Sequence, residues 1–181
     1  RQSMEWARAG FEPVKLAVNL SAVQFTEKGL AGMVGRKLLE SGIDTKLLEL
    51  EITESVVMED VEATIEILEE LNALGVSLSI DDFGTGYSSL SYLKRFPIDR
   101  IKIDKSFIDG IGEEADAGAI VNAVVSLGHT LGLEVTAEGV ETEDQLRYLK
   151  GQGCEEIQGY FFSRPLPEAE FRQFVEARRQ G

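Results

Sequence analysis

Asp81 and Asp82 are two adjacent carboxylates near the middle of the chain, and they are the starting point for locating a functional site. They end an alternating apolar and polar run that begins at Val76, which is the period-two pattern of a β-strand. Adjacent anions at a strand end repel each other and lose hydration together, so a cation is expected beside them. A simple turn is the alternative, because Asp and the following Gly84 and Gly86 are common turn residues.

The elements that would position these carboxylates form six strand–helix units. The strands are expected at about 14–19, 47–53, 76–81, 100–104, 133–138 and 155–158. The helices are expected at about 30–39, 61–71, 88–95, 116–131 with Asp116 as its cap, 142–150 with a Thr142–Gln145 capping box, and from 167 onward with Phe171, Phe174 and Val175 facing the core. Strict alternation of this kind predicts a mostly parallel sheet.

The two faces of each strand differ in polarity, which helps to choose between an open doubly wound sheet and a barrel. Ile101 and Ile103 alternate with Arg100, Lys102 and Asp104, and the other strands show the same split. A TIM-like (β/α) barrel explains it, with helices on the apolar face and a lumen that is polar toward one end. Such a barrel usually has eight units and about 250 residues, so we infer that the first units are missing from this chain.

A polar residue stands at or near the carboxyl end of every predicted strand. The set is Asn19, Glu51, Asp81 with Asp82, Lys102, Glu138 and Gln158. Active sites of barrels lie at this face, and hard oxygen ligands suit Mg²⁺, Mn²⁺ or Ca²⁺ rather than zinc or copper. Asp81 and Asp82 could bridge two ions about 4 Å apart, and Lys102 could orient a nucleophile or neutralise a phosphate. The plainer interpretation is a set of ordinary polar strand ends, which their common register disfavours.

The composition limits the class of partner. The chain has 32 acidic and 18 basic residues and a formal net charge of −14. This balance argues against binding a nucleic-acid polymer, but it allows a phosphate substrate if metal ions supply positive charge. A single cysteine, Cys154, predicts a core residue in a reducing, cytoplasmic setting. The most apolar stretch, 119–133, is too short to insert into a membrane.

Six segments, taken together, resemble the EAL-domain family of cyclic di-GMP phosphodiesterases. They are Asn19-Leu20-Ser21, Glu49 to Ser55 (ELEITES), Asp81 to Leu90 (DDFGTGYSSL), Ile101 to Asp104 (IKID), Ala137 to Glu141 (AEGVE) and Gln158-Gly159-Tyr160. They occur in family order and cover nearly the whole chain. The resemblance implies the barrel fold, with a first family strand that is usually antiparallel to the others.

The resemblance also implies a two-metal site. In the family pattern, Asn19, Glu51 and Asp81 would hold one ion, and Asp81, Asp82 and Glu138 would serve the second. The expected ions are Mg²⁺ or Mn²⁺, with Ca²⁺ inhibitory. Two divalent ions would neutralise the phosphate and lower the pKa of the attacking water.

Other residues carry further implied roles. Lys102 would position or activate the attacking water, Gln158 would assist at the water or metal shell, and Glu54 would anchor the loop from Phe83 to Leu90. The implied reaction is hydrolysis of one phosphodiester bond of cyclic di-GMP to linear pGpG. The implied partners are a second copy in a homodimer and sensor or cyclase domains fused to or regulating the enzyme.

One departure from the family pattern leaves the activity open. The Glu-Ala-Leu motif that names the family is absent, and its expected place is before Arg1. We therefore interpret residues 1–181 as an N-terminally incomplete EAL-type phosphodiesterase domain. One alternative is a degenerate domain that binds cyclic di-GMP or a protein without hydrolysis. Another, from the residues alone, is a Mg²⁺ barrel enzyme that stabilises an enolate.

Overall fold

Six β-strands form one parallel sheet in the order in which they occur along the chain. The structure is a computed structural model that describes residues 2–8, 10–11, 13–86, 90–112 and 115–179. The strands are β1 (Leu16–Asn19), β2 (Leu48–Thr53), β3 (Ser77–Phe83), β4 (Arg100–Ile103), β5 (Glu134–Ala137) and β6 (Glu156–Ile157). Each lies close to its predicted range.

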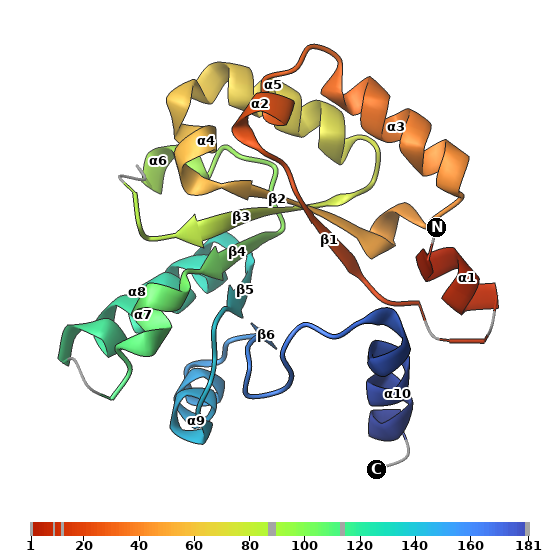
Figure 1. The fold of residues 1–181 in the computed structure, drawn as a ribbon. Helices are drawn as coiled ribbons and strands as arrows, with labels where there is room; N and C mark the ends of the chain where they lie inside the picture. Colours follow the sequence, from red (N-terminus) through yellow and green to blue (C-terminus); the bar gives the residue numbers. More distant parts are fainter. Residues whose placement is uncertain (1, 9, 12, 87–89, 113–114, 180–181) are drawn as a thin grey trace.

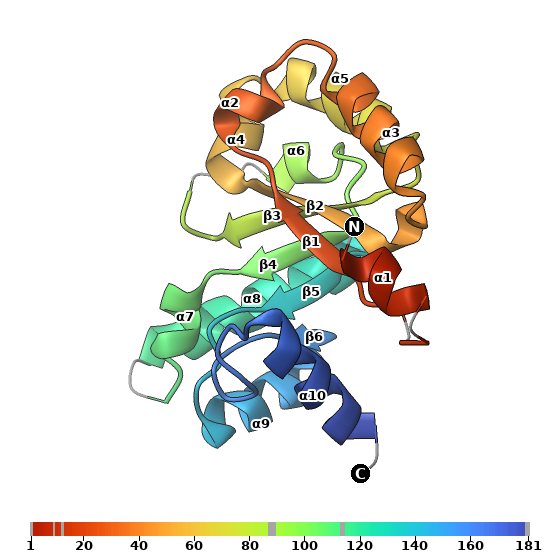
Figure 2. The ribbon, with the colours of Figure 1, turned by 45° about the vertical axis from the view of Figure 1, so that its right-hand side comes forward.

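The strand order confirms the barrel-type prediction. A doubly wound sheet reverses its strand order at a switch point, whereas here each strand pairs with the next along the chain, as in a (β/α) barrel. Figures 1 and 2 show the twisted sheet with α3 and α5 beside β1 to β3 and with α8 against β4 and β5. The described strands thus form a half-barrel with β1 and β6 at its edges.

The helices include most of those predicted and several short ones that were not. They are α1 (Gln2–Arg8), α2 (Ala22–Phe25), α3 (Leu30–Ser41), η1 (Thr45–Leu47, a 3₁₀ turn), α4 (Glu54–Glu59), α5 (Val61–Asn72), α6 (Leu90–Leu93), α7 (Lys105–Asp109), α8 (Ala115–Leu131), α9 (Glu143–Gln152) and α10 (Glu168–Arg179). The unpredicted α2, α4, α7 and η1 are too short to show a 3.6-residue period. No helix of the described ranges is long and apolar enough to cross a membrane.

The two predicted helix caps have different outcomes. The Thr142–Gln145 capping box is confirmed, because Thr142 Oγ1 accepts from the Gln145 N–H at 3.2 Å and Gln145 Oε1 accepts from the Thr142 N–H at 3.0 Å. The prediction for Asp116 was wrong, because α8 begins at Ala115 and Asp116 lies inside the helix.

The C-terminal helix does not join the core as predicted. Phe171, Phe174 and Val175 are only partly buried, and none belongs to the buried core. Instead, the Phe171 ring stacks on Trp6 of α1, with ring centroids 5.2 Å apart. Both views place α10 near α1 (Figures 1 and 2). The helix does have the predicted apolar face, but this face packs on α1. Helical periodicity identifies the apolar face of a helix and does not specify its partner.

The core lies between the apolar faces of the strands and the covering helices. Ile52, Leu78, Ile80, Ile101 and Ile103 are fully buried, and they pack with equally buried residues of α5, α8 and α9, namely Leu68, Leu71, Val121 and Leu149. The alternating strand residues point to the opposite face, where charged groups are also buried. This split confirms the parity argument for a polar lumen.

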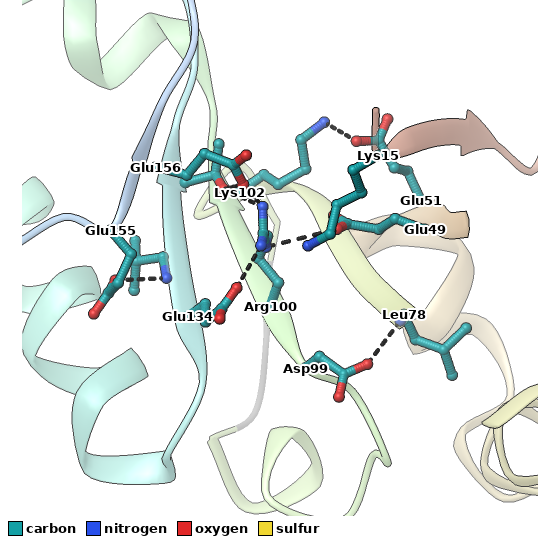
Figure 3. A network of polar contacts seen from close by, with 12 residues as sticks. Lys15, Glu49, Glu51, Leu78, Asp99, Arg100, Lys102, Glu134, Glu155 and Glu156 are labelled. Atoms are coloured by element: carbon teal, nitrogen blue, oxygen red, sulfur yellow. Dashed lines mark hydrogen bonds and ion pairs between the residues drawn. The ribbon is translucent and has the colours of Figure 1, made fainter. Parts of the chain in front are cut away.

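Arg100 forms the centre of a buried polar network toward the amino ends of the strands (Figure 3). Only 7% of the residue is exposed. Its guanidinium contacts acceptors on three other strands, namely Glu49 on β2, Glu134 and Thr136 on β5, and Glu156 on β6. The network thereby ties β4 to strands on both sides of it, and a second cation, Lys15, lies 3.4 Å from Glu49.

Replacing Arg100 is expected to destabilise the fold strongly. Arg100→Met removes the buried one of the two cations that contact the Glu49 carboxylate, and breaking a buried ion pair typically costs roughly 3–5 kcal/mol of unfolding free energy. The matched control is Arg95→Met, because Arg95 pairs with Glu62 on the exposed surface and should change stability little. Urea unfolding followed by circular dichroism measures both, and equal losses in the two variants would contradict the prediction.

Cys154 is expected to be unreactive in the folded protein. Its side chain is buried, as predicted, and burial raises the pKa of the thiol to about 11. Since the thiolate is the reactive form, labelling by an aromatic disulfide reagent at pH 8 should be slow in buffer and rapid in denaturing urea. Equal labelling rates in the two conditions would place Cys154 at the surface.

Candidate active site

Lys102 lies at the centre of a cluster of carboxylates at the carboxyl end of the sheet. Its Nζ is 2.6 Å from Glu51 Oε1, 2.6 Å from Glu138 Oε1 and 3.2 Å from Asp81 Oδ1. These acceptors come from β2, from β3 and from the residue directly after β5, and Figure 3 shows the contact with Glu51. We call these four residues the Lys102 cluster. It brings together four of the residues predicted from strand ends.

Burial and the neighbouring carboxylates have opposite effects on the pKa of Lys102. Lys102 is 4% exposed, and burial by itself disfavours its ammonium form. The hydrogen bonds to Glu138 and Glu51 outweigh that effect, so the pKa of Lys102 is raised. Burial and the nearby charges of Asp81 and Glu51 raise the pKa of Glu138, although Lys102 acts in the other direction. The site therefore consists of carboxylates shielded from water, and the Lys102 ammonium at its centre keeps its positive charge.

Asp82 lies beside the cluster in a strained backbone conformation. Its φ of 54° is the only positive φ of a non-glycine residue in the described ranges. Burial, Asp81 and Asp104 raise the pKa of Asp82, and part of this effect is a hydrogen bond between the Asp82 and Asp104 side chains. Backbone strain of this kind is often found at functional sites.

Asp104 is a site residue that the sequence reasoning missed. Burial tends to raise the pKa of its carboxyl, but hydrogen bonds from Ser106, Lys105 and Asp82 lower it. Asp104 also caps α7, since its Oδ1 accepts from the Ser106 N–H at 3.0 Å. The signal was present in the sequence, because Asp104 shares the strand face of Arg100 and Lys102. Asp104 stands in the predicted strand pattern and in the IKID segment, but no role at the site was predicted for it.

Glu54 contacts the glycine loop that follows the two aspartates. The residue is 1% exposed, and its Oε2 accepts from the Gly84 N–H at 2.7 Å and from the Gly86 N–H at 3.4 Å. A Cβ on Gly86 would lie 2.7 Å from Glu54 Oε1, so the close approach requires glycine. The expected loop extends to Leu90, but residues 87–89 lie outside the described ranges.

Asn19 and Gln158 lie at the two edges of the same face. Asn19 pairs in register with Glu51, and Gln158 follows β6 and donates its N–H to Ala137 O at 2.8 Å. Both residues are exposed. The structure therefore places them near the carboxyl ends of the strands without burying them in the Lys102 cluster.

The donor set fits a hard divalent cation. Carboxylate oxygens from separate strands, with an amide at the edge, are ligands that Mg²⁺, Mn²⁺ and Ca²⁺ accept. Over the described residues, no three His, Cys, Asp or Glu side chains stand in an arrangement ready to hold a metal ion. The carboxylates of the cluster converge on the Lys102 ammonium instead.

Comparison with known proteins gives a consistent family. The family model of the EAL domain matches residues 1–165. The chain is 49% identical over 167 residues to a protein of Pseudomonas aeruginosa named bifunctional diguanylate cyclase/cyclic di-GMP phosphodiesterase MucR. That match covers 92% of this chain and 24% of MucR, so the chain spans about a quarter of the relative's length.

Solved structures of relatives superpose closely. A cyclic di-GMP complex of the MucR phosphodiesterase has a TM-score of 0.90 and 48% identity, covering 94% of this chain and 69% of that one. BlrP1 of Klebsiella pneumoniae, solved with manganese and cyclic di-GMP, has a TM-score of 0.79 and 35% identity, covering 88% of this chain and 41% of that one. BlrP1 was also solved with calcium and cyclic di-GMP.

These matches select among the interpretations made from the residues. An enolate-stabilising barrel enzyme has no support among them, whereas the resemblance read from the six motifs is confirmed. The match of the EAL model extends over most of the chain, and it includes the residues of the Lys102 cluster. This chain therefore belongs to the EAL domain family.

Proposed function

We propose that this chain is a phosphodiesterase domain that hydrolyses one phosphodiester bond of cyclic di-GMP to linear pGpG in a metal-dependent reaction. The observation that carries the proposal is the Lys102 cluster, which gathers three carboxylates and a cation at the carboxyl ends of parallel strands. In the reaction, a water oxygen bonds to phosphorus, the bond from phosphorus to the 3′ oxygen breaks, and that oxygen leaves with a proton.

The proposed metal ligands are those predicted from the sequence. Asn19, Glu51 and Asp81 would hold one divalent ion, and Asp81, Asp82 and Glu138 would hold the second. Bound Mg²⁺ or Mn²⁺ would neutralise the phosphate and lower the pKa of the attacking water. The oxygen-only donor set supports this choice, as does the manganese in the solved BlrP1 complex.

Lys102 is proposed to position or activate the attacking water. Its hydrogen bonds to Glu138 and Glu51 raise the pKa of Lys102, so while these contacts last its amine is protonated near neutral pH. The ammonium can orient the attacking water or neutralise a phosphate oxygen. Gln158, at the β6 edge of the same face, would assist with its amide.

Glu54 is proposed to hold the Gly84–Gly86 segment so that Asp81 and Asp82 stay in place. The two hydrogen bonds from the loop to the buried Glu54 carboxylate support this role. In the proposed enzyme, this loop controls metal binding and contributes to a homodimer.

The names of its relatives support a proposal about which other domains accompany or regulate this one. The name of MucR joins a cyclase activity to the phosphodiesterase, and another relative, DosP of Escherichia coli, is named an oxygen sensor protein. We therefore propose fusion to or regulation by cyclase or sensor domains. The unpaired Cys154 agrees with a cytoplasmic location.

A second candidate function is a domain that binds cyclic di-GMP or a protein without hydrolysis. One observation favours it: no three His, Cys, Asp or Glu side chains among the described residues are arranged to hold a metal ion. Turnover and binding measurements separate the two candidates.

Hydrolysis of cyclic di-GMP by the unmodified chain is the direct test. We expect pGpG to form with Mg²⁺ or Mn²⁺ and not with Ca²⁺ or a chelator, as followed by liquid chromatography. Glu51→Gln should lower kcat at least about 100-fold. Even the loss of a residue that only hydrogen-bonds a metal ligand typically lowers activity or metal affinity about 10–100-fold. Glu69→Gln, on the exposed face of α5, is the matched control and should keep full activity. Binding of cyclic di-GMP without any turnover would favour the binding module.

The loop contact gives an independent prediction. Gly86→Ala places a Cβ 2.7 Å from Glu54 Oε1 and should displace the loop, lowering kcat/KM by about 10- to 100-fold. Gly151→Ala is the control, because a Cβ there has no heavy atom within 4 Å and Gly151 lies within α9. Circular dichroism checks that both variants are folded. Unchanged kcat/KM in Gly86→Ala would remove the proposed role of Glu54.

A further inference from the structure

The Lys102 ammonium contacts the same oxygens that the proposed function assigns to metal ions. Glu51, Asp81 and Glu138 each have a carboxylate oxygen within 3.2 Å of Lys102 Nζ, and all three are proposed ligands. Side-chain exposure is 5% for Lys102 and 8% for Glu51, so solvent screens this contact poorly. One cation therefore already offsets part of the negative charge of the three carboxylates.

An ammonium and a divalent ion compete in such a ring. Ligand oxygens stand 2.0–2.6 Å from Mg²⁺ or Ca²⁺, whereas the two shortest contacts to Nζ are 2.6 Å. A divalent ion at these oxygens would stand close to the ammonium, and like charges repel strongly where water is excluded. Lys102 must then move or give up contacts when a metal ion binds.

Other cations do not replace Lys102 in this position. Arg100, two residues earlier on β4, forms ion pairs with Glu134 and Glu156 nearer the amino ends of the strands. Lys105 is 46% exposed in its side chain and pairs with Glu141 and Asp109 outside the cluster. Within the described part of the chain, these three carboxylates form ion pairs with Lys102 and with no other cation, so its removal would leave them facing one another uncompensated.

We propose that Lys102 is an internal counter-cation that stabilises the metal-free domain and weakens its affinity for divalent ions. This inference rests on the proposed function for the identity of the metal ligands. Its consequence is a site that stays folded without metal and loads metal only when the ion outcompetes the ammonium. Lys102 then sets the metal concentration at which the domain becomes competent, in addition to its role toward the attacking water.

Metal binding by the protein without substrate tests the inference. Chelator-treated protein is titrated with Mn²⁺ by calorimetry, and its melting temperature is measured with and without Mn²⁺. Lys102→Met should bind Mn²⁺ at least about tenfold more tightly, because a nearby positive charge is removed. It should also melt at a lower temperature than the unmodified protein when metal is absent. Its melting temperature should rise more than that of the unmodified protein when Mn²⁺ is added.

The controls make the outcomes distinct. Lys105→Met removes one positive charge outside the cluster and should leave the affinity for Mn²⁺ unchanged. Lys102→Gln, which keeps a hydrogen-bond donor but not the charge, is used if the metal-free Met variant does not fold, and it should also bind more tightly. Equal or weaker Mn²⁺ binding by the Lys102 variant overturns this inference alone. Absence of Mn²⁺ binding by both the unmodified protein and the Lys102 variant overturns both the inference and the proposed metal site.

Discussion

The burial of one ammonium among three carboxylates is the interaction on which the rest of this site depends. Charges removed from water are tolerated only when they are paired and hydrogen-bonded, and Lys102 meets this condition through Glu51, Asp81 and Glu138. Each partner comes from a different part of the sheet. The strands must therefore stand in the observed register for the charges to be neutralised, so the fold and the site stabilise each other.

The lumen of the half-barrel contains two layers of charge separated by two residues of one strand. Arg100 pairs with acceptors toward the amino ends, and Lys102 pairs toward the carboxyl ends. Side chains two residues apart share a face, which explains why one strand supplies both cations. The first layer holds the sheet together, and the second places chemistry where barrels have their active sites.

The loop after β3 links this charge balance to backbone conformation. Asp82 adopts a positive φ, and Gly84 and Gly86 donate to the buried Glu54 carboxylate. Glycine is needed at Gly86 because Glu54 leaves no room for a Cβ. The buried Glu54 carboxylate thus fixes the loop that directly follows the strained Asp82, while Asp81 contacts Lys102 and Asp82 lies near Asp104.

Local patterns in the amino-acid sequence predicted the six strand–helix units and the split between apolar and polar strand faces. They also predicted the strand ends that carry Glu51, Asp81, Lys102 and Glu138. These features follow from local periodicity, which reports the face of a side chain. Three contacts could be found only in the folded protein: Lys102 lies between the carboxylates, Asp104 lies near Asp82, and α10 packs on α1. Such contacts depend on distances between segments far apart in the chain, and a local pattern holds no record of them.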